Sequence, residues 1–146
     1  MSPKQNAAVV VLMTCAGEKE ARKIADALLQ EKAAACVSIF PQGESFFWWE
    51  GKIDRAEEFL LVAKTVVRAL PRLVALVKRN HSYRVPEIVA LPIVGGNPEY
   101  LQWLGEETRG KSEGRSKKSE GRRQKSEGRR QKAEVRRQKA EVRSKK

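Results

Sequence analysis

The sequence predicts an α+β fold, a ferredoxin-like βαββαβ sandwich that ends in a short C-terminal helix. Three observations lead to this prediction. Strand-like and helix-like segments follow one another in that order between residues 7 and 94, a long aromatic hairpin lies between the two helices, and a short amphipathic segment follows the last strand. In such a fold two helices cover one face of a four-stranded antiparallel sheet.

The domain begins with a strand and a helix. Residues 7–14 are a nearly uninterrupted apolar run with several β-branched side chains, as expected for a buried strand. Residues 18–32 carry apolar side chains on one stripe. Glu18 and Glu20 stand near the start of this segment, where the positive end of the helix dipole favours them.

A long hairpin follows the first helix. Residues 35–40 form the second strand, which Pro41 and Gly43 interrupt, and the aromatic run at 46–49 resumes extended structure before the turn EGK. Residues 58–66 form the returning strand. The two arms predict an antiparallel pair of the second and third strands. In the predicted sheet, the first and second strands flank the third.

A helix, a strand and a short third helix complete the domain. Pro71 opens the second helix, because proline is favoured in the first helical turn. Residues 87–94 form the fourth strand, and Asn97 then caps a helix that Pro98 begins. The apolar positions of the two helices are Leu70, Leu73, Val74 and Val77 in the second, and Tyr100, Leu101, Trp103 and Leu104 in the third.

The strands predict that the chain associates with copies of itself. The segments VVVLM, FLLVA and IVALPIV are apolar at both side-chain parities, yet two helices can cover only one face of the sheet. An uncovered apolar face of this size would promote aggregation. We therefore expect a homo-oligomer in which another subunit buries the second face.

The positive charge of the chain is concentrated at its C-terminal end. The 146 residues carry a formal net charge of +12, with 30 Lys or Arg against 18 Asp or Glu. Residues 111–146 hold 16 of the basic residues and five Glu, which leaves 14 against 13 in residues 1–110. The sequence therefore predicts a nearly neutral domain over 1–110 and a basic tail over 111–146.

The tail is a heptad repeat that reads KSEGRSK, KSEGRRQ, KSEGRRQ, KAEVRRQ and KAEVRSK before a final lysine. No pair of heptad positions is consistently apolar, so the repeat does not predict a coiled coil. One interpretation is a solvated, largely disordered or partly helical extension. The alternative is a polycation that binds nucleic acid or an anionic lipid surface non-specifically, without stacking, because the tail has no aromatic residue.

Composition also predicts a cytoplasmic protein. No apolar run approaches the length of a membrane-spanning helix, and the N-terminal residues do not resemble a signal peptide. Cys15 and Cys36 are too few for a disulfide scaffold, and a reducing compartment keeps them as thiols. With a single histidine and no recognisable nucleophile and base pair, an enzyme is the least supported class.

Five segments resemble the signature segments of the CutA family of divalent-cation-tolerance proteins. They are AAACVSI at 33–39, FWWEGKI at 47–53, LVAKT at 61–65, HSYRVPEIVALPI at 81–93 and GNPEYLQWL at 96–104. The resemblance covers roughly residues 7–109 and leaves the tail outside it. It implies a trimer of ferredoxin-like subunits similar to the PII signalling proteins, and a role in the response to divalent metal ions, with copper the usual candidate.

Candidate metal ligands are few. Copper favours thiolate and imidazole ligands, so Cys15, Cys36 and His81 are the chemical candidates, with Met13 as a thioether and Glu87 as a carboxylate. The predicted topology places the two cysteines about 10 Å apart, which excludes a disulfide and a metal shared within one subunit. Cys36 occupies the position of the family's AAC segment, and the alternative there is a small buried apolar residue.

His81 follows the second helix, in a loop where we expect a polar side chain to stay accessible. It is either a ligand at a cleft or a C-terminal cap that satisfies the last helix carbonyls. A PII-like trimer implies a second kind of site, an intersubunit cleft for a small anionic ligand. Trp49, Tyr83 and Tyr100 would supply its aromatic wall, and Lys64 its cation. Alternatively, these four side chains serve as packing and interface residues. The single glycine in CAGEKE provides no phosphate-binding loop.

Overall fold

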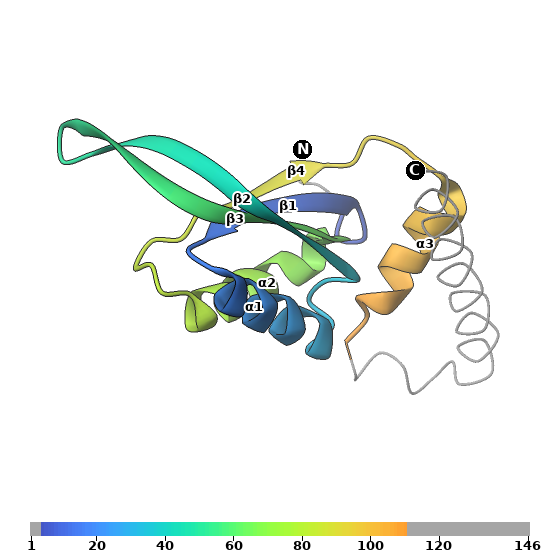
Figure 1. The fold of residues 1–146 in the computed structure, drawn as a ribbon. Helices are drawn as coiled ribbons and strands as arrows, with labels where there is room; N and C mark the ends of the chain where they lie inside the picture. The colour runs from blue at the N-terminus through green and yellow to red at the C-terminus, as the bar shows by residue number, and fades with distance from the viewer. Residues whose placement is uncertain (1–3, 111–146) are drawn as a thin grey trace, which may run out of the picture. The chain divides into compact units, whose positions relative to one another are not determined.

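A computed structural model of the chain describes residues 4–110 and confirms the predicted element order (Figure 1). The elements are β1 (Ala8–Cys15), α1 (Glu18–Gln30), β2 (Cys36–Trp49), β3 (Lys52–Val66), a 3-10 turn (Val67–Ala69), α2 (Leu70–Asn80), β4 (Ile88–Pro92) and α3 (Pro98–Glu107). The start of β3 differs most from the prediction, by six residues, and the ends of α1 and β4 each come two residues earlier than predicted. The predicted heptad-repeat tail, residues 111–146, lies outside the described residues.

The four strands form one antiparallel sheet in the order β2-β3-β1-β4. The first and second strands therefore flank the third, as predicted. β1 lies in the interior, paired on one side with β3 and on the other with β4. This order, with α1 and α2 as crossovers, is the ferredoxin-like arrangement expected from the sequence.

The hairpin is longer and more continuous than predicted, and it extends well beyond the other strands (Figure 1). Pro41 and Gly43 do not break β2 but lie at a register shift between Phe40 and Gly43, as in a β-bulge. Proline is tolerated there because β2 is an edge strand. At the tip, Glu50 and Gly51 both have positive φ, as a two-residue type I′ turn requires.

One face of the sheet packs against α1 and α2, which lie side by side (Figure 1). Alternate side chains of β1 point into this core, and they are joined by Leu61 and Ala63 of β3. The helices contribute one apolar stripe each, as their sequences predict. The fully buried residues of the two helices are Ala21, Ile24 and Leu28 in α1, and Leu73 and Val77 in α2.

The other face of the sheet, here called the open face, is apolar and only partly covered. Val10 and Leu12 of β1 stand on it, opposite Leu91 and Val89 of β4, which are 44% and 45% exposed. α3 packs at one end, where its buried Leu104 joins a small second core. The expectation of a second apolar face is therefore met in the single chain. No helix within residues 4–110 has the length and hydropathy needed to span a bilayer.

Candidate functional site

The structure divides the predicted site residues into two groups and one isolated position. The His81 group lies where the end of β1, the start of α1 and the loop after α2 meet. The Cys36 group lies on the open face beside α3. Trp49 stands alone at the tip of the hairpin. The His81 group comprises Cys15, Glu20, His81, Ser82 and Tyr83, and the Cys36 group comprises Cys36, Lys64 and Tyr100.

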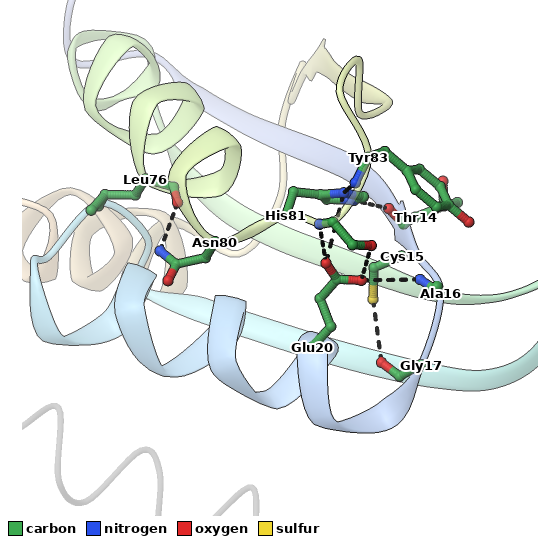
Figure 2. Close-up of polar contacts among 10 residues, drawn as sticks. Thr14, Cys15, Ala16, Gly17, Glu20, Leu76, Asn80, His81 and Tyr83 are labelled. Atoms are coloured by element: carbon green, nitrogen blue, oxygen red, sulfur yellow. Dashed lines mark hydrogen bonds and ion pairs between the residues drawn. The ribbon is translucent and has the colours of Figure 1, made fainter.

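His81 is a buried bridge and not an accessible ligand (Figure 2). Its side chain is 0% exposed, so the expectation of accessibility was wrong. Its Nδ1 accepts a hydrogen bond from the Tyr83 backbone N–H at 3.0 Å, and its Nε2 lies 2.8 Å from the carbonyl oxygen of Thr14. Because Nδ1 accepts, Nε2 carries the proton in the neutral ring. Both nitrogens are thereby occupied, and metal binding would require one of these bonds to break.

The helix-capping role considered for the His81 ring falls to its neighbour. His81 is the residue at which α2 ends, but its imidazole points to β1. Asn80 Nδ2 donates instead to the carbonyl oxygen of Leu76, at 2.8 Å, and so satisfies one of the last helix carbonyls (Figure 2). The ring of His81 is therefore free to fix the end of β1 against the loop.

Glu20 holds this group together, and sequence reasoning did not single it out as a site residue. Its carboxylate accepts hydrogen bonds from the backbone N–H and the hydroxyl of Ser82 and from the Ala16 N–H, and it lies 3.9 Å from Nδ1 of His81 (Figure 2). Burial alone would raise the pKa of Glu20, but these hydrogen bonds outweigh it and hold that pKa below its usual value.

Cys15 has little metal-binding character. Its side chain is fully buried in the core beneath the helices, with Sγ 3.6 Å from the carbonyl oxygen of Gly17. Burial raises the pKa of the Cys15 thiol, and the carboxylates of Glu20 and Glu58 raise it further, whereas the Gly17 backbone lowers it in part. The thiolate is the form that binds metals, so this environment disfavours ligation.

Tyr83 completes the His81 group, and Glu87 borders it. Burial and the neighbouring carboxylate of Glu58, which also hydrogen-bonds to the phenol, raise the pKa of Tyr83. The Tyr83 ring lies 4.9 Å from the His81 ring between centroids. Glu87 accepts a hydrogen bond from the hydroxyl of Thr14 at 3.1 Å. These contacts give Tyr83 and Glu87 structural roles beside the bridge that His81 makes.

The Cys36 group joins two strands and a helix. Cys36 and Lys64 are direct partners across β2 and β3, so their side chains share the open face. Nζ of Lys64 lies 6.0 Å from the ring centroid of Tyr100. Burial and the adjacent Cys36, to which the phenol hydrogen-bonds, raise the pKa of Tyr100 to about 12. All three side chains are half-buried, and within residues 4–110 Lys64 makes no ion pair.

The two cysteines are even farther apart than predicted. Cys15 pairs with Phe59 of β3 and Cys36 with Lys64, five residues along the same strand. They are therefore separated by about 17 Å along the strands as well as about 10 Å across them. Both are free thiols. In the part of the chain that the structure describes, no three His, Cys, Asp or Glu side chains are placed to hold a metal ion.

The predicted ligand cleft is likewise not assembled within one chain. Lys64 and Tyr100 meet, but Tyr83 belongs to the His81 group. Trp49 pairs with Lys52 at the hairpin tip, 12 residues from Lys64 along β3, or roughly 40 Å. A site that contains Trp49 and Lys64 together therefore needs a second copy of the chain.

The fold, with its long hairpin and its short final helix, corresponds to a known family. The model of the family described as CutA1 divalent ion tolerance protein matches residues 9–107. The chain belongs to the CutA family. The fold, the hairpin segment FWWEGKI and the loop that carries His81 all lie inside the matched region, and the basic tail lies outside it.

Relatives come from bacteria, archaea, plants and animals. The divalent-cation tolerance protein CutA of Thermus thermophilus is 52% identical over 99 residues, which are 68% of this chain and 96% of that protein. A chloroplastic CutA of Oryza sativa is 46% identical, and the match spans only 57% of its length. The solved structure of the Thermus thermophilus protein superimposes with a TM-score of 0.69 at 50% identity, covering 70% of this chain and 99% of that one.

Proposed function

We propose that the chain is a non-enzymatic metal-response protein that supports tolerance of divalent cations, acts as a homotrimer and binds copper through Cys36. One observation favours Cys36 over the other candidates: its thiol is half-exposed on the open face, whereas Cys15 is buried and both ring nitrogens of His81 are engaged. A soft thiolate ligand suits copper better than a hard cation.

Copper binding through Cys36 requires ligands from more than one subunit. Within residues 4–110 of a single chain, Cys36 does not belong to any group of three or more His, Cys, Asp or Glu side chains that could hold a metal ion. Its immediate neighbours are the ammonium of Lys64 and the phenol of Tyr100. The positive charge of Lys64 repels a bare divalent cation. The proposal therefore depends on assembly, which the apolar open face and the exposed hairpin favour.

Calorimetric titration of the metal-free full chain with copper, and separately with zinc, tests this function. We expect copper to bind more tightly than zinc, Cys36→Ser to abolish the tight phase, and the matched variant Cys15→Ser to retain it. Equal loss in both variants, or no difference between the two metals, would contradict the role assigned to Cys36.

A second candidate function is sensing of a small anionic ligand. It is favoured by the half-buried residue Lys64, whose ammonium makes no ion pair within residues 4–110 and lies beside the Tyr100 ring. Tryptophan fluorescence of the assembled chain, followed during titration with nucleotides and organic acids, tests it. No response in wild type, or an undiminished response in Lys64→Gln, would count against this candidate.

We further propose a cytoplasmic location and no catalytic activity. The two free thiols suit a reducing compartment. The only histidine is buried with its ring nitrogens committed to backbone groups, so it is poorly placed to act as a general base.

A further inference from the structure

The buried ring of His81 controls the loop of residues 82–87, which leads from α2 into the edge strand β4. As a neutral ring it accepts the backbone N–H of Tyr83 at Nδ1 and donates from Nε2 to the carbonyl oxygen of Thr14 (Figure 2). We propose that proton uptake by His81 loosens this loop, so that the ring and the Glu20 carboxylate form an acid-sensitive latch. The latch involves neither Cys36 nor a metal ion.

The hydrogen bond to Tyr83 exists only with the neutral ring. A protonated imidazole carries hydrogen on both nitrogens and has no acceptor left. Its Nδ1–H would then face the Tyr83 N–H, which is now 3.0 Å from Nδ1, and two donors at this distance repel each other. The bond from Nε2 to Thr14, 2.8 Å long, survives because Nε2 donates in both states. The ring therefore stays attached to β1 while it loses its hold on the loop.

Glu20 supplies a competing partner for the protonated ring. Its Oε1 accepts the backbone N–H of Ser82 and lies 3.9 Å from Nδ1 of His81. Both side chains are largely buried, so solvent and salt screen their attraction only weakly. A protonated Nδ1 that approaches Oε1 competes with the Ser82 N–H for the same oxygen. Protonation thus weakens two consecutive backbone hydrogen bonds of the loop, and the hydroxyl of Ser82 keeps its bond to Oε2.

Glu20 is the anion best placed to receive the protonated ring. Among residues 4–110 it is the only acidic group within ion-pair distance of a ring nitrogen. The other titratable or charged groups around the ring come from the loop and from three further elements. They are Cys15 of β1, Glu58 of β3, Lys78 and Arg79 of α2, and Tyr83, Arg84 and Glu87 of the loop. The ordinary titration ranges of these side chains lie outside about pH 5 to 7.5, so the charge that changes there belongs to His81.

NMR of the full chain tests the latch, because the chain has a single histidine whose ring signals are unambiguous. At about pH 7.5 the ring nitrogens should show the neutral Nε2–H form, and at about pH 5 both should carry protons. Hydrogen exchange of the Tyr83 N–H, corrected for its intrinsic pH dependence, should become about tenfold faster at the lower pH, as expected for the loss of one hydrogen bond. The Leu28 N–H inside α1 is the internal control and should not change. A ring that stays neutral at about pH 5, or a Tyr83 N–H whose exchange does not respond when the ring is protonated, would overturn the proposal.

Variants assign the acid response to the two members of the latch. In Glu20→Gln the ring should take up its proton at a lower pH, because the nearest anion is gone, whereas the matched variant Glu18→Gln should titrate like wild type. In His81→Gln the exchange of the Tyr83 N–H should differ less than about twofold between the two pH values, since glutamine does not titrate. An undiminished acid response in His81→Gln, or an unchanged titration in Glu20→Gln, would refute the latch. Circular dichroism checks that each variant is folded, and the wild-type titration is decisive if His81→Gln is not.

Discussion

Single side chains tie together segments that are remote in the sequence. Glu20 joins the first turn of α1 to the loop after α2 through its bonds to Ser82, and His81 joins the same loop to the end of β1. Both side chains are largely buried, with 16% and 0% exposure. When a buried carboxylate loses one of the hydrogen bonds that it accepts, the folded protein loses stability.

Glu20→Gln should lower the free energy of unfolding by about 1–3 kcal/mol at neutral pH, because the amide NH2 cannot accept the bonds that one carboxylate oxygen accepts. Urea unfolding measures the difference. Glu18→Gln is the matched control, since its exposed ion pair with Arg22 contributes at most about 1 kcal/mol. A larger effect at Glu18 than at Glu20 would contradict the role of the buried carboxylate.

The stability difference between wild type and Glu20→Gln should also depend on pH. The folded pKa of Glu20 lies below its unfolded value of about 4.3, so ionised Glu20 adds stability above that pH. This stability is lost as the pH falls through the folded pKa. The difference in unfolding free energy between wild type and Glu20→Gln should therefore shrink below about pH 4.3. A difference that is constant with pH would show that the carboxylate is not the group responsible.

At the scale of elements, the hairpin depends on two special backbone positions. Glycine 43 sits at the bulge, where a Cβ would lie 2.8 Å from the backbone oxygen of Glu58. Gly51 adopts a φ of 77° in the turn, which favours glycine. The bulge lets β2 continue past Pro41 without losing its partner, and the hairpin thereby reaches beyond the rest of the sheet (Figure 1).

Gly43→Ala should destabilise the chain by about 1–3 kcal/mol, because the added methyl group meets backbone that cannot rotate away. Thermal unfolding followed by circular dichroism measures the change. Gly105→Ala in α3 is the matched control: nothing lies within 4 Å of its added Cβ, and alanine favours helix by up to about 1 kcal/mol. Equal effects of the two substitutions would refute the close approach at the bulge.

At the scale of the molecule, apolar surface remains uncovered in two places. One is the open face, and the other is the hairpin, where Phe46, Trp48, Trp49 and Ile53 are each more than 60% exposed. Large exposed apolar patches mark interaction surfaces. Self-association through both surfaces would also bring the hairpin of one copy to another and complete sites that one chain leaves open.

Leu91→Glu should weaken the proposed trimer, because it places a carboxylate on the open face without touching the helix-covered core. Sedimentation velocity over a range of concentrations measures the assembly. Ala75→Glu on the exposed side of α2 adds the same charge away from the open face and should leave assembly unchanged. A trimer that resists Leu91→Glu would place the subunit interface elsewhere.

Removal of residues 111–146 should abolish binding to polyanions and leave assembly intact. The deletion removes 16 basic residues and five glutamates, almost the whole net charge of the chain. Filter binding to a single-stranded oligonucleotide should fall steeply with increasing salt for the full chain, and the truncated chain should show no binding. Binding that survives the deletion would assign it to residues 1–110.

Much of the fold could be predicted from the sequence, because its signals are local. Apolar periodicity, Pro71 and Pro98 at helix starts and Asn97 as a cap set the type and order of the elements. The doubly apolar strands predicted the open face. The local pattern around Gly43 predicts a break and not a bulge, because a bulge and a strand end look the same in sequence until the partner strand is known.

The candidate site was predicted as a set of residues and not as an arrangement. Residue type shows which side chains carry chemistry, and the element order predicts which strands are adjacent; both can be recognised along the chain. The meeting of Cys36 with Lys64 and Tyr100, the burial of Cys15 and the closure of Ser82 on a carboxylate 62 residues away emerge only in the folded chain. Such contacts depend on strand register and on chain closure over long separations, which no local pattern encodes.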